Sequence, residues 1–362
     1  QRGPMACARG LLSCDMRRTS IALALVLLGC DGSSAPPDGG EPREDAGAAG
    51  LDAALADAAR PDAAAPDQDG GGGPSGWRDE APVPVRIQEI AVEAHEGRVW
   101  IAGGFAGAAA IVTAVRIYAP RTREWTGGPD LPAPRHHMSL VSHGGDLYAL
   151  GGMQTAAFEP LDTAWVLREG AAAWAPIASL PEDRGAGAAD SVGDVIVMVG
   201  GNGAAGRLAN RTLIYDPGRD AWSFGADIPT EREHLAAVAV DGELYVLAGR
   251  RNSLGSTRVE LEIYDPVADS WRDGPDLPYP RGGFDAALLA GSIYAVGGEE
   301  PATVLRTVDR LDLTTGVWSA APETRVAHHG HGVATVEGRL YVVAGASRPA
   351  FGAIDAVESY AP

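Results

Sequence analysis

Short apolar stretches recur along residues 77–362, and each is bounded by glycine, proline or aspartate. Residues 147–150 (LYAL) and 244–247 (LYVL) are two examples. Apolar runs this short, without a helical period, are typical of β-strands. A glycine-containing pair such as Asp241-Gly242 precedes each run, and such pairs favour tight hairpins, here with residues 235–240 as the partner strand. The pattern therefore predicts an all-β fold.

Tryptophan marks the phase of an internal repeat. Six tryptophans are spaced 48, 49, 48, 49 and 47 residues apart: Trp77, Trp125, Trp174, Trp222, Trp271 and Trp318. A doublet of small residues lies 26 positions after each of them: Gly103-Gly104, Gly151-Gly152, Gly200-Gly201, Ala248-Gly249, Gly297-Gly298 and Ala344-Gly345. Seven positions before five of the tryptophans stands Tyr118, Leu167, Tyr215, Tyr264 or Leu311. Six copies in one register indicate a repeat architecture.

Each repeat contains four short predicted strands, which is typical of a propeller blade. The chain ends at Tyr360-Ala361-Pro362, after a third strand and without a fourth. Trp77 opens a strand that has no three strands before it. We therefore expect the N-terminal strand to complete the last blade, which closes a ring of six blades and leaves no seam.

The doublet, tyrosine and tryptophan at these spacings resemble the kelch motif, complete here as Gly200-Gly201, Tyr215 and Trp222. The copies depart from it at Ala248, Ala344, Leu167 and Leu311. The resemblance covers residues 77–362 and implies a six-bladed kelch β-propeller with four-stranded blades, in which the loop face around the central mouth commonly takes the ligand. Kelch copper oxidases of the galactose oxidase type need a Tyr–Cys crosslink, and residues 77–362 contain no cysteine. That chemistry is excluded, and no cofactor is expected.

The N-terminal region predicts that the protein is targeted to the cell envelope. After a probable extension (residues 1–15), residues 16–29 read MRRTSIALALVLLG and end before Cys30, which is typical of a bacterial lipoprotein signal with the lipid on Cys30. An ordinary cleaved signal is the alternative. Residues 30–76 are rich in Ala, Asp, Gly and Pro and predict a disordered tether. The expected location is the bacterial cell envelope, lipid-anchored and either periplasmic or surface-exposed.

Charge narrows the possible partners. The chain has 29 basic residues, all of them Arg, and 48 acidic ones, for a net charge of −19. Subtracting residues 1–76 leaves −14 for the propeller. A general phosphate-binding surface is therefore not expected, which excludes nucleic acid as a partner.

Arginine recurs at a further repeat position, ten residues after four of the tryptophans. We call these residues the arginine column: Arg135, Arg184, Arg232 and Arg281. These positions open the first strand of each blade and share a face with the loops after the doublets, including Arg250. A ring of guanidinium groups there would bind an anionic ligand. The alternative is that each Arg bonds a carbonyl or an Asp in the next blade and recurs because the architecture repeats.

Histidines cluster beside this column at His136, His137, His234, His328, His329 and His331. We name His136, His234 and His329 as candidate ligand-binding residues together with the five arginines. Alternate blades could bring imidazoles together near the channel mouth, but packing in the channel or bonding to loop backbone is the favoured interpretation. No metal site and no catalytic residue is assigned.

Two functions remain open. The first is a binding module that recognises a protein or glycan ligand, with the arginines suiting an anionic one. The second is a sugar-active enzyme similar to the periplasmic N-acetylneuraminate mutarotase, a six-bladed kelch protein. The loops after the doublets are expected to be short, about five to eight residues, which favours the binding module.

Overall fold

A computed structural model describes residues 76–107 and 109–362. The predicted extension, signal peptide, Cys30 and residues 31–75 of the tether lie outside the described residues. The chain divides into units 1–66 and 67–362, and the account below concerns the second. Within the described residues, no helix is long and apolar enough to cross a membrane.

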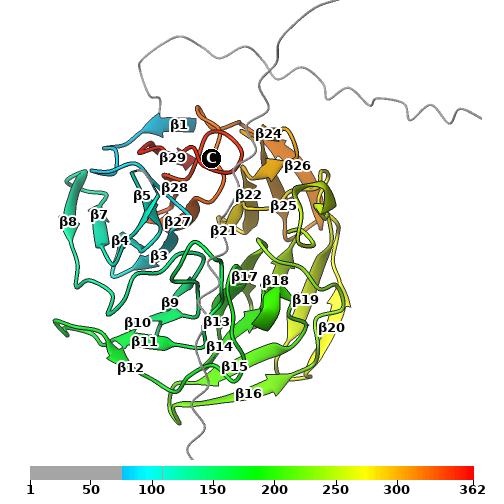
Figure 1. Cartoon of the computed structure of the whole chain (residues 1–362). Helices are drawn as coiled ribbons and strands as arrows, with labels where there is room; N and C mark the ends of the chain where they lie inside the picture. Colours follow the sequence, from blue (N-terminus) through cyan, green and yellow to red (C-terminus); the bar gives the residue numbers. More distant parts are fainter. Residues whose placement is uncertain (1–75, 108) are drawn as a thin grey trace, which may run out of the picture. The chain divides into compact units, whose positions relative to one another are not determined.

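Six four-stranded antiparallel sheets are arranged around a central axis (Figure 1). Blades 1 to 3 consist of β3 (Ala91–His95), β4 (Arg98–Ala102), β7 (Val115–Ala119) and β8 (Glu124–Gly127); β9 (Ser139–His143), β10 (Asp146–Leu150), β11 (Ala164–Leu167) and β12 (Ala175–Pro176); and β13 (Ala188–Val192), β14 (Val195–Val199), β15 (Thr212–Asp216) and β16 (Ala221–Gly225).

Blades 4 to 6 repeat the same order. They consist of β17 (Ala236–Val240), β18 (Glu243–Leu247), β19 (Leu261–Asp265) and β20 (Ser270–Asp273); β21 (Asp285–Leu289), β22 (Ser292–Val296), β25 (Val308–Asp312) and β26 (Val317–Ala321); and β27 (Gly332–Val336), β28 (Arg339–Val343), β29 (Val357–Ala361) and β1 (Gly76–Asp79). The first strand of each blade lies nearest the axis (Figure 1). The predicted fold class is confirmed: a six-bladed β-propeller.

The last blade closes as predicted, because β1 pairs antiparallel with β29 and places Trp77 opposite Tyr360. Blade 3 has the same register between two strands that are consecutive in sequence, where Tyr215 lies opposite Trp222. The N-terminal strand therefore occupies the outer position that a local fourth strand fills in the other blades.

The tryptophan column joins neighbouring blades. Each indole N–H donates a hydrogen bond to a backbone carbonyl in the loop that follows the preceding blade. The pairs are Trp77–Pro322, Trp125–Ala81, Trp174–Pro129, Trp222–Ala178, Trp271–Ala226 and Trp318–Pro275, at 2.7–2.9 Å. A buried indole usually finds such an acceptor. The regular spacing of tryptophan along the chain therefore reflects one contact made at every blade interface.

The loops after the small doublets are longer than predicted. After the doublet, 9 to 11 residues precede the third strand of each blade; in blade 3 that strand begins at Thr212. These loops carry local structure of their own. β5 (Phe105–Ala106) lies between β6 (Ala110–Ile111) and β2 (Ile87–Gln88) and pairs with both. β23 (Glu299–Glu300) and β24 (Thr303–Val304) form a hairpin, and short 3₁₀ turns occur at Ala204–Gly206 and Leu254–Ser256. They provide enough chain to build walls around the mouth.

Candidate functional site

A closed ring of backbone hydrogen bonds surrounds the axis. It consists of the residues that stand twelve positions after each tryptophan, and each donates its N–H to the carbonyl of the ring residue in the preceding blade. The bonds are Glu89 to Gly330 (2.6 Å), His137 to Glu89 (3.3 Å), Ala186 to His137 (2.9 Å), His234 to Ala186 (2.8 Å), Gly283 to His234 (3.0 Å) and Gly330 to Gly283 (2.8 Å). We call these six residues the central ring.

All six ring residues have a left-handed backbone, with φ between 53° and 60°. Glycine adopts this conformation freely, and it does so at Gly283 and Gly330. A residue with a side chain pays about 1–2 kcal/mol for it. Strained residues of this kind cluster at functional sites, so the side chains of Glu89, His137 and His234 are candidates for function.

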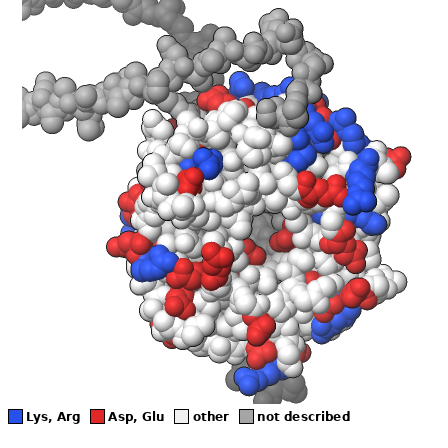
Figure 2. Space-filling model, turned by 180° about the vertical axis from the view of Figure 1, so that it is seen from behind, with Lys and Arg blue, Asp and Glu red and all other residues white. Residues whose placement is uncertain are grey.

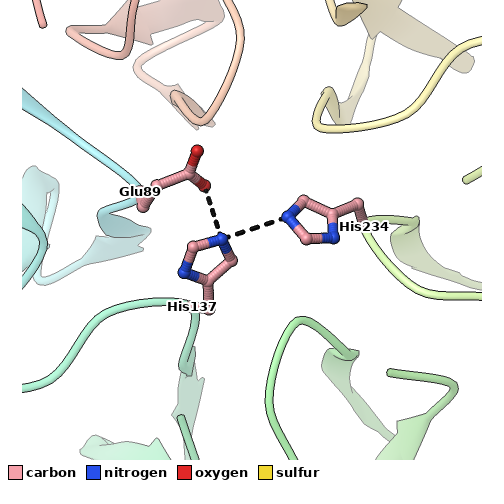
Figure 3. Close-up of side chains that lie close together, drawn as sticks. All are labelled: Glu89, His137 and His234. Atoms are coloured by element: carbon pink, nitrogen blue, oxygen red, sulfur yellow. Dashed lines mark hydrogen bonds and ion pairs between the residues drawn. The ribbon is translucent and has the colours of Figure 1, made fainter. Parts of the chain in front are cut away.

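These three side chains come from three blades and point toward one another (Figure 3). The Nε2 atoms of His137 and His234 lie 3.0 Å apart. A carboxylate oxygen of Glu89, Oε2, lies 3.1 Å from His137 Nε2. Gly330 leaves room for this carboxylate, because a Cβ at that position would lie 2.5 Å from Glu89 Oε1. We call Glu89, His137 and His234 the axial triad.

The triad lies at the base of a cavity of about 390 Å³, which we call the mouth cavity. This volume is within the range of small-molecule sites. Three phenylalanines from the long loops line it: the ring of Phe105 lies 6.1 Å from that of Phe158 and 5.4 Å from that of Phe351. Phe105 is buried, whereas Phe158 and Phe351 are 44% and 50% exposed. Two of the three rings are thus open to a ligand.

Hydrogen-bond partners assign the tautomers of the histidines. His136 Nε2 lies 3.1 Å from the carbonyl oxygen of Thr155, which accepts only, so this nitrogen carries the proton. His136 Nδ1 is then the acceptor for His137 Nδ1, 2.5 Å away. His234 Nδ1 contacts the carboxylate of Glu233 and donates to it. In the neutral imidazoles of His137 and His234, Nε2 therefore presents a lone pair.

Burial keeps these imidazoles neutral. It lowers the pKa of His136 to about 4, with the neighbouring His137 as a second cause. It lowers the pKa of His137 to about 3, and the charge of Arg250 adds to this effect. The pKa of His234 is lowered well below its ordinary value for the same two reasons. At neutral pH the imidazoles of His137 and His234 are thus uncharged, and each presents a lone pair on Nε2.

The remaining charges in the mouth cavity are mostly acidic. Arg250 donates from Nε to Glu233 Oε1 at 2.9 Å and also pairs with Glu299. Among the described residues that line the cavity, Glu89, Glu233 and Glu299 are acidic and Arg250 is basic, a formal balance of −2 with neutral histidines. The cavity therefore favours a neutral or cationic ligand over an anionic one.

A third imidazole is held beside the triad. His329 Nε2 lies 2.9 Å from the carbonyl of Arg348 and donates to it. Its Nδ1 is consequently an acceptor; it is buried without a hydrogen-bond donor, 3.8 Å from Glu89 Oε1 and 3.6 Å from Glu299 Oε2.

The arginine column does not form the expected exposed ring. Arg135, Arg184, Arg232 and Arg281 are at most 2% exposed. Their guanidinium groups bond inside their own blades: Arg232 pairs with Glu262 and donates to Val246 at 3.1 Å, and Arg281 pairs with Asp309 and donates to Gly297 at 3.1 Å.

Arg135 and Arg184 follow the same pattern. Arg135 donates to Thr163 Oγ1 at 2.7 Å and lies over the Trp165 ring, and Arg184 donates to the carbonyl of Arg211 at 3.0 Å. The prediction that these four arginines line an anion-binding mouth is wrong, because each lies just before the first strand of its blade and its side chain turns into the blade. Arg250, His136, His234 and His329 do lie at the mouth, although their role in binding is untested.

Sequence reasoning missed several residues of the mouth. Glu89 and the three phenylalanines were not selected, and His137 was noted only as a neighbour. Glu89 and His137 could have been found by comparing the six residues twelve positions after each tryptophan. Phe158 and Phe351 both stand 33 positions after a tryptophan, whereas Phe105 stands 28 positions after Trp77. Comparison of that repeat position could have found two of the three phenylalanines, and the loop structure places Phe105 beside them.

Below the central ring, the first strands of the blades line a channel that contains the buried carboxyl groups of Glu93, Asp190 and Asp285. Figure 2 shows the face opposite to the view of Figure 1, with a hollow at its centre and acidic side chains beside it. Burial raises the pKa of Asp285 to about 7. Both its oxygens accept backbone N–H groups, from Val333 at 2.7 Å and Ala286 at 2.8 Å, so this carboxyl also joins blades 5 and 6.

Comparison with known proteins supports the repeat assignment. The family model of the Kelch motif matches residues 231–278 and 280–325. The chain is 28% identical over 158 residues to mouse (Mus musculus) Kelch-like protein 35, covering 41% of this chain and 25% of that protein. It is 32% identical over 130 residues to Kelch-like protein terF of Aspergillus terreus, covering 35% of this chain and 28% of that protein.

The chain thus spans only about a quarter of the length of these curated relatives. A solved structure, reported as the structure of YjhT, superposes with a TM-score of 0.66 at 14% identity, covering 77% of this chain and 95% of that one. This likeness concerns the fold alone. The six-bladed architecture, the tryptophan contacts and the matched motif together identify a β-propeller that carries kelch repeats.

Proposed function

We propose that this chain is an envelope-anchored binding module that recognises a protein or glycan ligand in the mouth cavity. The anchor is the lipid expected on Cys30, and the propeller carries the recognition surface. A protein partner is the kind of partner that the kelch repeats favour. The comparisons leave the ligand itself open.

The mouth cavity carries this proposal. Phe158 and Phe351 expose aromatic faces beside a set of hydrogen-bonding groups that includes Asn202 and Arg250. Such a surface suits a ligand with one apolar face and several polar groups. A neutral sugar ring and an aromatic side chain of a partner protein both meet this description. The acidic balance of the cavity argues against the anionic ligand expected from the arginine column.

The experiment is a glycan and peptide array probed with the full chain, followed by affinity measurements on the best binder. We expect Phe158→Ala and Phe351→Ala to weaken binding about tenfold each, as for the loss of one aromatic contact. Phe224→Ala is the matched control, because Phe224 is similarly exposed (48%) but lies on the outer strand β16. Equal affinities for all three variants would show that the ligand binds elsewhere.

A second candidate function is sugar mutarotation or epimerisation. It is favoured by one observation: titratable groups of Glu89, His137 and His234 lie side by side at the base of a sugar-sized cavity, where acid–base chemistry would need them. The acidic balance favours a neutral sugar over N-acetylneuraminate. Anomeric exchange of sugars can be followed by NMR, and a rate with the full chain equal to that in buffer would exclude this function.

A further inference from the structure

The axial triad has an excess of acceptors. The tautomers of His137 and His234 direct two lone pairs toward one another across 3.0 Å. The third member is a carboxylate oxygen of Glu89, 3.1 Å from His137 Nε2. Three acceptor atoms meeting without a donor repel one another, unless a cation lies between them.

The spacing of these atoms suits a small metal ion. Tetrahedral zinc with bonds of about 2.05 Å places neighbouring ligand atoms about 3.3 Å apart. The observed distances of 3.0 and 3.1 Å are therefore within a few tenths of an ångström of those in a coordination shell. The three ligand atoms lie within 4.8 Å of one another.

The surroundings orient the histidines as metal sites do. Glu233 accepts the Nδ1 proton of His234, and His136, itself held by Thr155, accepts that of His137. Metal-bound histidines are held in this way by a carboxylate or another acceptor on the distal nitrogen. The buried Nδ1 of His329, which has no donor, lies beyond Glu89 and could accept a hydrogen bond from a metal-bound water.

The backbone supplies an independent argument. The central ring accepts glycine at two of its six positions, yet it carries His or Glu at three positions with the same left-handed φ. Each costs about 1–2 kcal/mol in backbone strain, and all three converge on one point.

We propose that the axial triad binds a divalent transition metal ion of the zinc class through His137 Nε2, His234 Nε2 and the Glu89 carboxylate, with the remaining coordination position facing the mouth cavity. Two imidazoles and one carboxylate with an open position are a donor set that such ions take. This inference goes beyond ligand binding and does not depend on it.

The test is zinc binding by the full chain after removal of metals with a chelator, measured by competition with a chromophoric indicator. We expect one tight equivalent of Zn²⁺, and Co²⁺ in its place should give the visible absorption of a four- or five-coordinate site. His137→Asn and His234→Asn should weaken zinc binding by about 100-fold or more. Asparagine is chosen because it tolerates a left-handed backbone better than alanine does.

Controls separate metal binding from folding and from ligand binding. His143→Ala removes an imidazole at the far end of β9, where it contacts Ser191, and should leave zinc affinity unchanged. Phe158→Ala should also keep the metal while losing the ligand. Zinc should raise the melting temperature of the parent chain and not that of His137→Asn.

Two results would overturn the proposal. The first is the absence of a stoichiometric zinc or cobalt site in the folded parent chain. The second is a zinc affinity in His137→Asn and His234→Asn equal to that of the parent. Either would mean that the axial triad holds no metal ion.

Discussion

At the scale of single residues, the buried arginines show how a repeated column can serve the architecture. Arg232 has no exposed surface, and its partner Glu262 is 3% exposed. Its carbonyl also accepts the N–H of Gly201 in the preceding blade at 2.8 Å. The residue thus bonds its own blade through the side chain and the neighbouring blade through the backbone.

We predict that Arg232→Ala lowers the free energy of unfolding by about 3–5 kcal/mol, because it leaves the Glu262 carboxylate buried and unpaired. Urea denaturation of the variant measures this loss. Arg219→Ala is the control, since the Arg219 side chain is 83% exposed and pairs only with Asp216 at 3.5 Å; its change should stay within about 0.5 kcal/mol. A similar stability for the two variants would contradict the structural role.

Asp285 gives a prediction on pH. Its folded-state pKa is raised to about 7 from an ordinary value of 3.8, mainly by burial. Between these values the folded state binds more protons than the unfolded state, so this group's contribution to stability is present below pH 4 and is lost as the pH rises to 7. A single group contributes a slope of at most about 1.4 kcal/mol per pH unit.

The measurement is the free energy of unfolding of the parent chain and of Asp285→Asn at pH 5 and at pH 8. We expect the free energy of unfolding of the parent to fall relative to that of Asp285→Asn as the pH rises from 5 to 8. Glu93 and Asp190 have pKa values raised by the same main cause. Asp190 also raises the pKa of Asp285, and Asp285 raises that of Glu93, so the difference measures Asp285 together with its coupling to these two groups. A difference that is independent of pH would show that Asp285 is ionised throughout.

At the scale of elements, β1 has the largest consequence for its size. Its four residues pair with β29, and the indole of Trp77 bonds Pro322 at 2.7 Å. Directly after it, buried Glu80 accepts hydrogen bonds from Tyr118 of blade 1 and Ser359 of blade 6. This segment therefore joins the first blade to the last.

Deleting residues 77–85 should lower stability by several kcal/mol, a large part of what a domain has, because it removes these contacts and opens the edge of β29. Deleting residues 31–66 should leave the melting temperature nearly unchanged. Differential scanning calorimetry of the two deletions measures the contrast, and equal melting would refute closure by β1.

The elements also show what the sequence could and could not predict. The strands, hairpins and closure followed from Trp, Tyr and Gly, because each makes one contact that recurs in every blade. The mouth was missed because its aromatic residues do not recur in every blade: Phe158 and Phe351 share a position 33 residues after a tryptophan, but the other four repeats carry no phenylalanine there. The arginine column was misread because a register position shows that a side chain recurs and does not show which way it points.

At the scale of the whole molecule, the proposed anchor is independent of the propeller. Cys30→Ala should move the protein from the membrane fraction to the soluble fraction, because the lipid is its expected link to the bilayer. Detergent phase partitioning of cells that express each form measures this. A variant that remains in the membrane fraction would refute the lipoprotein prediction without affecting the assignment of the mouth cavity.

In the central ring the backbone holds the blades together, and the side chains carry the chemistry. Every ring N–H and carbonyl is used within the ring, so the backbone closes in the same way whatever side chain each position carries. In chain order the ring residues are Glu89, His137, Ala186, His234, Gly283 and Gly330. Each is a separate site for substitution. A propeller of this kind can therefore acquire a new specificity through substitutions at the ring positions, with no rearrangement of its blades.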